Sequence, residues 1–138
     1  MCDFGFSTYG NCLVTKKLGT EAYMAPEIYE ARYNPCWAKP TDIFSLGVLF
    51  FILAFGAPPF HSAEQSDTYF RYLKIKPGST DYFKFHPHSR ALYAKGLIDE
   101  SLQVLLISML QADPHNRVEN IEELKNFEFF KTGLLTPE

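Results

Sequence analysis

The sequence predicts a mainly α protein that begins with a long irregular loop. Residues 43–57 are uncharged and almost entirely apolar, and residues 101–110 place apolar side chains at the spacing of a helix face. Few segments alternate apolar and polar residues as strands do. Residues 1–27 show little periodicity and hold three of the eight glycines, so they are expected to form the loop.

The chain after this loop is punctuated by proline. Pro26 is expected to begin a short helix that runs to Tyr29, because proline fits the first turn of a helix. The dipeptides at 34–35 and 39–40 both end in proline and are expected to break regular structure. An irregular stretch is therefore predicted between the short helix and the apolar segment.

The apolar segment at 43–57 is expected to be a buried helix, capped at its start by Thr41 or Asp42. It is apolar on all sides, which is typical of a helix surrounded by protein. A membrane span needs about 20 apolar residues, so a membrane-anchored protein is the weaker interpretation. One stripe of this helix comprises Leu46, Leu49, Phe50 and Leu53.

A shorter amphipathic helix is expected at 64–75, with Phe70 and Leu73 facing inward. Pro77 and a following glycine should end it. Residues 79–98 are aromatic without a clear period and are expected to form a loop.

Two helices are predicted near the C-terminus. The first begins at Ser101, is capped by Asp99 or Ser101, and faces inward with Leu102, Leu105, Leu106, Met109 and Leu110. The second begins near Asn120, which is spaced from Glu123 as in a capping box. Its inward residues are expected to be Ile121, Leu124 and Phe127.

Composition limits the kind of partner. The 138 residues carry a net charge of −3, with 46% hydrophobic and 16% aromatic residues, so the chain can build the core of one domain or part of one. The acidic balance argues against nucleic acid or an anionic membrane as the main partner, since both need a basic surface.

Cysteine and histidine suggest neither disulfides nor a metal centre. The three cysteines, Cys2, Cys12 and Cys36, form no C-x-x-C pair, which favours a reducing compartment and a cytoplasmic or otherwise intracellular location. The four histidines lack the spacing of zinc ligands and are expected in loops or at the surface. They are His61, His86, His88 and His115.

Two motifs in the N-terminal loop carry the strongest functional signal. Asp3-Phe4-Gly5 alone is a weak match to any family. Residues 19–27, however, read G-T-E-A-Y-M-A-P-E and resemble the G-T-x-x-Y-[ML]-A-P-E segment of Ser/Thr protein kinases. The two motifs follow in the order and at the separation of a kinase activation segment, from D-F-G to A-P-E.

Further matches extend the resemblance from residue 3 to about 130. Residues 42–48 resemble the D-x-[WF]-S-x-G-V start of the central kinase helix, and residues 113–117 resemble its later D-P-x-x-R. The resemblance implies the helical C-terminal lobe of the protein-kinase-like fold, without N-lobe and catalytic loop. It divides the chain into an activation segment at 1–27, a helical lobe at 28–130 and a tail at 131–138. The Pro-Pro-Phe ending at residue 60 is similar to that of the calcium/calmodulin-dependent-like group.

The resemblance gives the activation segment its expected roles. Asp3 would bind Mg²⁺ beside ATP, and Phe4 would set whether that carboxylate faces the site. Thr20 would bond into the catalytic loop and help select Ser or Thr, and Tyr23 would line the surface for the residue after the acceptor. The remaining motif positions are Gly5, Gly19, Ala25, Pro26 and Glu27.

It also implies structural support from the helical lobe. Glu27 and Arg117 would form a buried ion pair. Asp42 would accept hydrogen bonds from the catalytic loop, although a helix cap is the alternative. Leu49 and Leu53 would support the hydrophobic column under the adenine and are expected to be core residues in either case. Because the lobe packed on them is missing, apolar surface is also expected around Phe4 and Leu49.

Regulation departs from the usual pattern. Many kinases carry a phosphorylatable Thr four residues before the Thr of G-T, and Lys16 occupies that position here. Thr15 is adjacent and is the candidate phosphosite, with Ser7, Thr8 and Tyr9 as lesser candidates. Alternatively, Lys16 and Lys17 supply fixed charge in place of a phosphate.

Several kinase elements are absent from the sequence. It contains no G-x-G-x-x-G loop and no H-R-D, so the catalytic base Asp and the phosphate-anchoring Lys of the family are expected to be absent. It begins where the catalytic loop is expected to end, at a Met1 that is either internal to a longer kinase or the start of a truncated gene. The resemblance implies ATP-dependent phosphorylation of Ser/Thr in protein substrates, with the isolated chain inactive. The alternative is a non-catalytic protein-binding module near residues 64–75.

Overall fold

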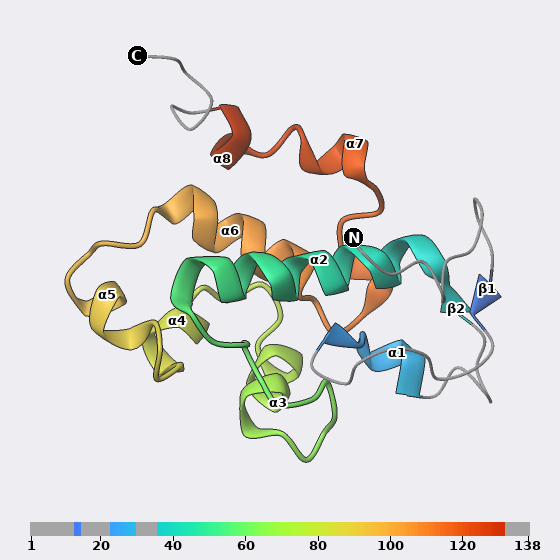
Figure 1. Cartoon of the computed structure of the whole chain (residues 1–138), viewed down its shortest axis with the longest axis horizontal. Coiled ribbons are helices and arrows are strands. Elements are labelled where there is room, and N and C mark those ends of the chain that lie inside the picture. The colour runs from blue at the N-terminus through green and yellow to red at the C-terminus, as the bar shows by residue number, and fades with distance from the viewer. Residues whose placement is uncertain (1–12, 15–22, 30–35, 132–138) are drawn as a thin grey trace.

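A computed structural model describes residues 13–14, 23–29 and 36–131 of the chain. This part is mainly helical, as the sequence predicts, with the helices arranged around α2 (Figure 1). The helices are α1 Pro26–Tyr29, α2 Ala38–Phe55, α3 Thr68–Ile75, α4 Tyr82–Phe85, α5 Arg90–Ala94, α6 Glu100–Met109, α7 Ile121–Leu124 and α8 Glu128–Lys131, with a 3₁₀ turn, η2, at Pro114–Asn116.

A short strand pair precedes the central helix. Strand β1, Leu13–Val14, runs antiparallel to β2, Cys36–Trp37, with Leu13 opposite Trp37 and Val14 opposite Cys36. The loop expected at 1–27 therefore contains a strand. Most of that segment lies outside the described residues. The short helix expected from Pro26 to Tyr29 is confirmed as α1.

Helix α2 packs closely against α6, and a glycine permits this approach. A side-chain carbon placed on Gly47 would lie 2.8 Å from Cβ of Met109. The helix begins at Ala38, so the prediction that Thr41 or Asp42 caps it was wrong, as was the break at residue 40. Pro40 is tolerated because amide groups of the first helical turn have no acceptor within the helix.

Aromatic rings fill the space between α2, α3 and α4. Phe51 of α2 is fully buried, and its ring centre lies 4.7 Å from that of Phe55 and 6.1 Å from that of Phe83. The ring centre of Phe60 lies 5.5 Å from that of Phe70 on α3. Most aromatic residues of the described part are buried in the core clusters or pack against them.

Helix α3 is shorter than the predicted 64–75. It starts at Thr68 because the Asp67 carboxylate accepts from the amides of Tyr69 and Phe70 and so caps the first turn. Phe70 and Leu73 face inward, as expected.

The predicted loop at 79–98 contains helices α4 and α5, so this prediction was wrong. Each helix is little more than one turn, too short to show a hydrophobic period. Tertiary contacts hold the segment instead: Tyr82 and Phe83 are buried, and the Tyr82 hydroxyl donates to the Pro59 carbonyl. Buried Ser89 donates to the Phe83 carbonyl at 2.8 Å.

His86 lies in the bend after α4, in agreement with the expected loop position, but its side chain is buried and not at the surface. Its Nε2 donates to the Pro58 carbonyl at 3.2 Å, and its Nδ1 accepts from the His88 amide at 3.1 Å. The neutral ring thus satisfies both partners. Burial lowers the pKa of His86 below its ordinary value, while the Pro58 carbonyl opposes that shift in part.

Stability is therefore expected to fall as the pH drops below about 6.5, the ordinary histidine pKa. Below that value the unfolded chain binds a proton at His86 before the folded chain does, so the free energy of unfolding decreases with decreasing pH. Urea titrations at pH 5.0 to 7.5 measure the slope of the free energy of unfolding against pH. The His86→Phe variant should show a shallower slope, and an unchanged slope would contradict the assignment.

The C-terminal helices keep most of their predicted features. Asp99 caps α6 by accepting from the Ser101 amide at 2.8 Å, and Asn120 caps α7 by accepting from Glu123. Ile121, expected to face inward, is exposed. Helix α7 has only four residues, so Leu124 suffices to anchor it, in a second cluster with Ile43, Leu105, Met109 and Val118.

No helix in the described ranges is both long and apolar enough to cross a membrane. The reading of residues 43–57 as an anchor therefore has no support in this part of the chain. The segment lies instead largely in α2, where much of its apolar surface is covered by other helices.

Candidate functional site

The best-defined polar site lies beneath α1, where Glu27 meets Arg117. Arg117 Nη1 lies 2.6 Å from Glu27 Oε2, and Arg117 Nη2 lies 3.0 Å from Glu27 Oε1. The Arg117 side chain is fully buried and that of Glu27 is 11% exposed. This is a bidentate ion pair, the strongest arrangement for a guanidinium and a carboxylate. The structure thus brings together two residues 90 positions apart.

Arg117 also donates to backbone carbonyls of two other segments. Nε and Nη2 bond to Gln111 at 3.0 and 2.8 Å, and Nη1 bonds to Pro40 at 2.9 Å. Its guanidinium carbon lies 4.9 Å from the centre of the Phe44 ring. One side chain therefore ties α1 to the start of α2 and to the turn after α6.

Two residues of α2 that were not predicted as site residues also fix α1. Thr41 Oγ1 donates to Glu27 Oε2 at 3.0 Å, and Ser45 Oγ donates to the Tyr23 carbonyl at 2.7 Å. Ser45 was part of the motif match at 42–48, but nothing in the sequence indicates its partner. Together these bonds place the backbone of residues 23–27 over the N-terminal half of α2.

The predicted motif residues at the start of α1 and just before it differ in burial. Ala25 is fully buried, Pro26 is half-buried, and the Tyr23 side chain is exposed. A buried alanine lets the chain approach the core closely, while Tyr23 is left free to contact another molecule. The structure thus presents a short surface supported from below by the Glu27–Arg117 pair.

Asp42 lies one turn into α2 and is exposed. Atoms packed around its carboxyl nonetheless raise the pKa of Asp42 above its ordinary value. Within the described residues no hydrogen bond to this carboxylate is found. Because Asp42 is inside the helix, the alternative role as a helix cap is excluded.

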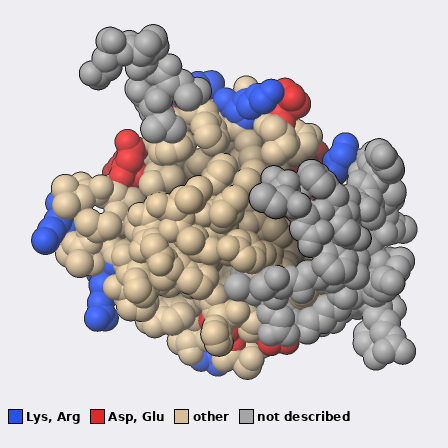
Figure 2. All heavy atoms as spheres, viewed as in Figure 1, with Lys and Arg blue, Asp and Glu red and all other residues tan. Residues whose placement is uncertain are grey.

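Leu49 and Leu53 were expected in the core, and this was wrong. Leu49 is 40% exposed and Leu53 is 75% exposed. The apolar surface expected around Leu49 is thus present. Figure 2 shows the face of the molecule that α2 helps to form. On this face the charged side chains lie mainly at the margins. The two leucines are one helical turn apart, so they project from the same side of α2.

Six predicted site residues lie outside the described residues: Asp3, Phe4, Gly5, Thr15, Gly19 and Thr20. Within the described ranges no group of His, Cys, Asp and Glu side chains could hold a metal ion. The expected Mg²⁺ ligand and the candidate phosphosite therefore stay predictions.

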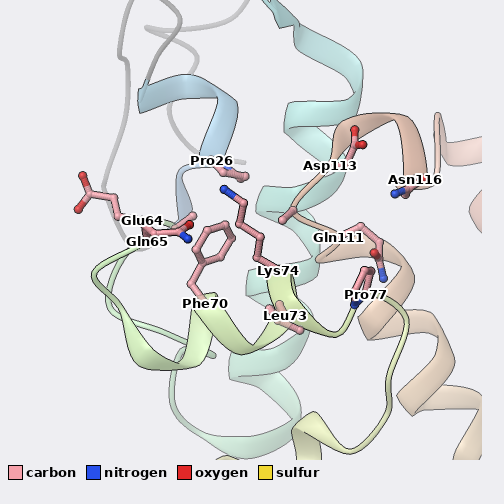
Figure 3. A pocket seen from close by; sticks show the side chains of 12 residues that line it. Pro26, Glu64, Gln65, Phe70, Leu73, Lys74, Pro77, Gln111, Asp113 and Asn116 are labelled. Carbon is pink, nitrogen blue, oxygen red and sulfur yellow. The ribbon is translucent and has the colours of Figure 1, made fainter.

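A hollow of about 690 Å³ lies beside this site, between α1, α3 and the turn that follows α6. We call it the large hollow. Figure 3 shows Lys74 reaching from α3 toward Pro26, with the Phe70 ring beneath, while Glu64 points away. Buried Phe70 and Leu73 supply an apolar floor, and polar residues from the turn after α6 supply part of the rim.

Comparison with known proteins identifies the family of this chain. The family model described as "Protein kinase domain" matches residues 1–130. The chain belongs to the protein kinase domain family. Its helices thus form the helical lobe of the protein-kinase-like fold, as the motifs predicted. The Glu27–Arg117 pair joins the A-P-E and D-P-x-x-R motifs of that family.

The relatives are Ser/Thr kinases. The chain is 35% identical over 107 residues to "Calcium/calmodulin-dependent protein kinase type II" of Caenorhabditis briggsae, covering 78% of this chain and 17% of that protein. It is 30% identical over 141 aligned positions to "Serine/threonine-protein kinase SRK2E" of Arabidopsis thaliana, covering 97% of this chain and 34% of that protein. The chain thus spans about a third or less of these relatives.

Proposed function

We propose that this chain is part of a Ser/Thr protein kinase domain that transfers phosphate from ATP to Ser or Thr of protein substrates. The observation that carries the proposal is the Glu27–Arg117 pair, which holds residues 23–27 as a supported surface beside exposed Tyr23. Residues 1–27 would be the activation segment, 28–130 the helical lobe and 131–138 a tail. The 35% identity to a calcium/calmodulin-dependent kinase supports that group as the kinase type.

The residues of this chain would position the substrate rather than perform the transfer. Tyr23 would contact the residue after the acceptor, and Thr20 would help select a hydroxyl acceptor. Within the described residues no group of His, Cys, Asp and Glu could hold a metal ion, so no metal-dependent step is assigned to them. Asp3 would be the single Mg²⁺ ligand contributed here, and Thr15 the candidate phosphosite.

Leu49 and Leu53 would pack against the rest of the kinase domain. They are exposed apolar residues on one side of α2, and the same helix carries Asp42, which has a raised pKa and no hydrogen bond in the described ranges. A catalytic loop and N-lobe placed there would bury the leucines and supply donors to Asp42. The three cysteines form no C-x-x-C pair in the sequence, which supports an intracellular location for such a domain.

The purified 138-residue chain is expected to transfer no phosphate. Transfer needs a base, a phosphate-anchoring lysine and an adenine pocket, which one Mg²⁺ ligand does not replace. Incorporation of radiolabelled phosphate from ATP into a Ser-containing protein would measure this. A chimera that joins this chain to the upstream kinase residues of the Caenorhabditis relative should gain activity, and Asp3→Ala should abolish it.

The chimera with Lys125→Ala, a change at an exposed residue directly after α7, is the matched control and should keep its activity. Phosphate transfer by the isolated chain that is sensitive to Asp3→Ala would overturn the inactivity. A folded chimera that binds ATP yet transfers nothing would overturn the kinase proposal itself.

A second candidate is a non-catalytic protein-binding module, which the large hollow favours. Its volume of about 690 Å³ is within the range of sites that hold a ligand, and Phe70 and Leu73 form its apolar floor. Such a site would accept a protein segment near residues 64–75. The Asp3→Ala variant distinguishes the two candidate functions. Docking at the large hollow should be unchanged in this variant, whereas phosphate transfer should be lost.

A further inference from the structure

The charges of this chain are divided very unevenly. Residues 68–98 hold six basic residues and one acidic residue, giving this segment a net charge of +5. The rest of the chain holds seven basic and fifteen acidic residues, giving −8. Since charges interact over about 8–10 Å at physiological salt, the local charge decides what binds at a surface. The segment comprises α3, α4 and α5, and Figure 2 shows basic side chains along the edge where these helices lie.

An aromatic hollow lies within this basic segment. It has a volume of about 340 Å³, is lined by Tyr72, Asp81, Lys84 and Phe85, and lies on a different part of α3 from the large hollow. We call it the small hollow. The Tyr72 and Phe85 rings stack with centres 5.1 Å apart and an interplanar angle of 18°. Phe85 is 42% exposed, so this pair forms an accessible apolar wall.

Positive charge flanks this wall at the end of α3 and on α4. Lys76 Nζ lies 5.8 Å from the centre of the Tyr72 ring, and Lys84 lines the hollow from α4. Asp81 is the one acidic residue of the segment. Ile75, at the end of α3, is 67% exposed and adds apolar surface near Lys76.

We propose that the small hollow and its lysines dock an acidic segment of a partner protein that carries a large apolar side chain. The apolar side chain would enter against Tyr72 and Phe85, and its acidic neighbours would pair with Lys76 and Lys84. Arg71, Arg90 and Lys95 extend the positive field for a longer acidic segment. This docking role is independent of phosphate transfer. It also differs from docking at the large hollow, because it uses another surface and defines the charge of the partner.

A peptide fits this surface better than a bilayer or a nucleic acid does. The apolar feature includes a concave site that a side chain can enter, whereas a bilayer is flat. The Tyr72 and Phe85 rings already stack on each other, which occupies faces that a nucleobase would use. Outside the segment, the described residues hold four basic and eleven acidic residues, and this net charge of −7 would repel a long polyanion that extends beyond the segment.

The test uses the full 138-residue chain and a fluorescent twelve-residue peptide of Asp and Glu with two Leu residues. Fluorescence anisotropy should show binding that weakens several-fold between 50 and 300 mM NaCl. Lys76→Glu/Lys84→Glu should lower the affinity at least tenfold. Lys39→Glu/Lys131→Glu makes the same change in net charge at exposed positions outside the segment and should change it less than threefold.

The apolar wall is tested separately from the charge. Replacing both Leu residues of the peptide by Ser should lower the affinity at least fivefold, and NMR shifts of the unmodified chain should move at Tyr72 and Phe85. Equal losses in the two lysine variants, or no binding at 50 mM NaCl, would overturn the proposal. Tighter binding of polyuridylate or of phosphatidylserine vesicles than of the peptide would overturn it in favour of those partners.

Discussion

Replacing Arg117 by leucine is expected to lower the free energy of unfolding by about 3–5 kcal/mol, because it leaves the largely buried Glu27 carboxylate without its counter-charge. The carbonyls of Gln111 and Pro40 lose their donors in the same variant. Urea unfolding followed by circular dichroism measures the change. Since small domains have only about 5–15 kcal/mol of stability, this one substitution could unfold much of the population.

Two further variants separate the ion pair from other effects of the substitution. Lys125→Leu removes the exposed Lys125–Glu122 pair and should change the free energy of unfolding by less than about 1 kcal/mol. Glu27→Leu combined with Arg117→Leu should be less destabilised than the sum of the two single variants, because neither charge is then left alone. A single Arg117→Leu variant as stable as the parent would show that the pair contributes nothing.

Truncating Phe51 to alanine is expected to cost about 3–5 kcal/mol, because a fully buried ring is removed from the centre of the aromatic core. Its ring contacts lie in two helices and one bend: Phe55 on α2 itself, Phe83 on α4, and His86 in the bend after α4. Chemical denaturation measures the loss. Retention of the parent stability would mean that the neighbouring rings close the cavity completely.

Leu53→Ala provides the matched control on the same helix. Leu53 is 75% exposed, so its truncation should change the stability by less than about 0.5 kcal/mol in this chain. In the chimera with the upstream kinase residues, the same substitution should cost more, because the proposed packing would bury Leu53. A large loss in the isolated chain would contradict the exposed position.

The sequence predicted the presence of helices α2, α3 and α6 because hydrophobic period and capping act over one or two turns. Helix α6 follows its apolar spacing, and Asp99 and Asn120 cap helices as expected. The start of α2 was misplaced because Pro40 was expected to be a break before the helix. Proline is also accepted in the first turn of a helix, and Pro40 lies there. Helices α4 and α5 were missed because segments of four or five residues carry no readable period.

At the candidate site, too, some contacts were predicted from the sequence and others were found only in the structure. The motifs predicted that Glu27 and Arg117 meet, and the structure places them in a bidentate pair. Nothing local in the sequence relates Thr41 or Ser45 to α1, since their bonds depend on how α2 is oriented. Helical spacing also placed Leu49 and Leu53 in the core, because an apolar pattern does not say whether a partner covers each face.

By itself, the sequence determined the family, the mainly helical class and the identity of the motif residues, because these depend on residue type and spacing. Only the tertiary structure decided which apolar residues are buried, how His86 is satisfied and where the basic segment meets an aromatic hollow. The physical reason is that burial and electrostatic field depend on neighbours distant in sequence, whereas helix propensity and capping depend on neighbours within a few residues.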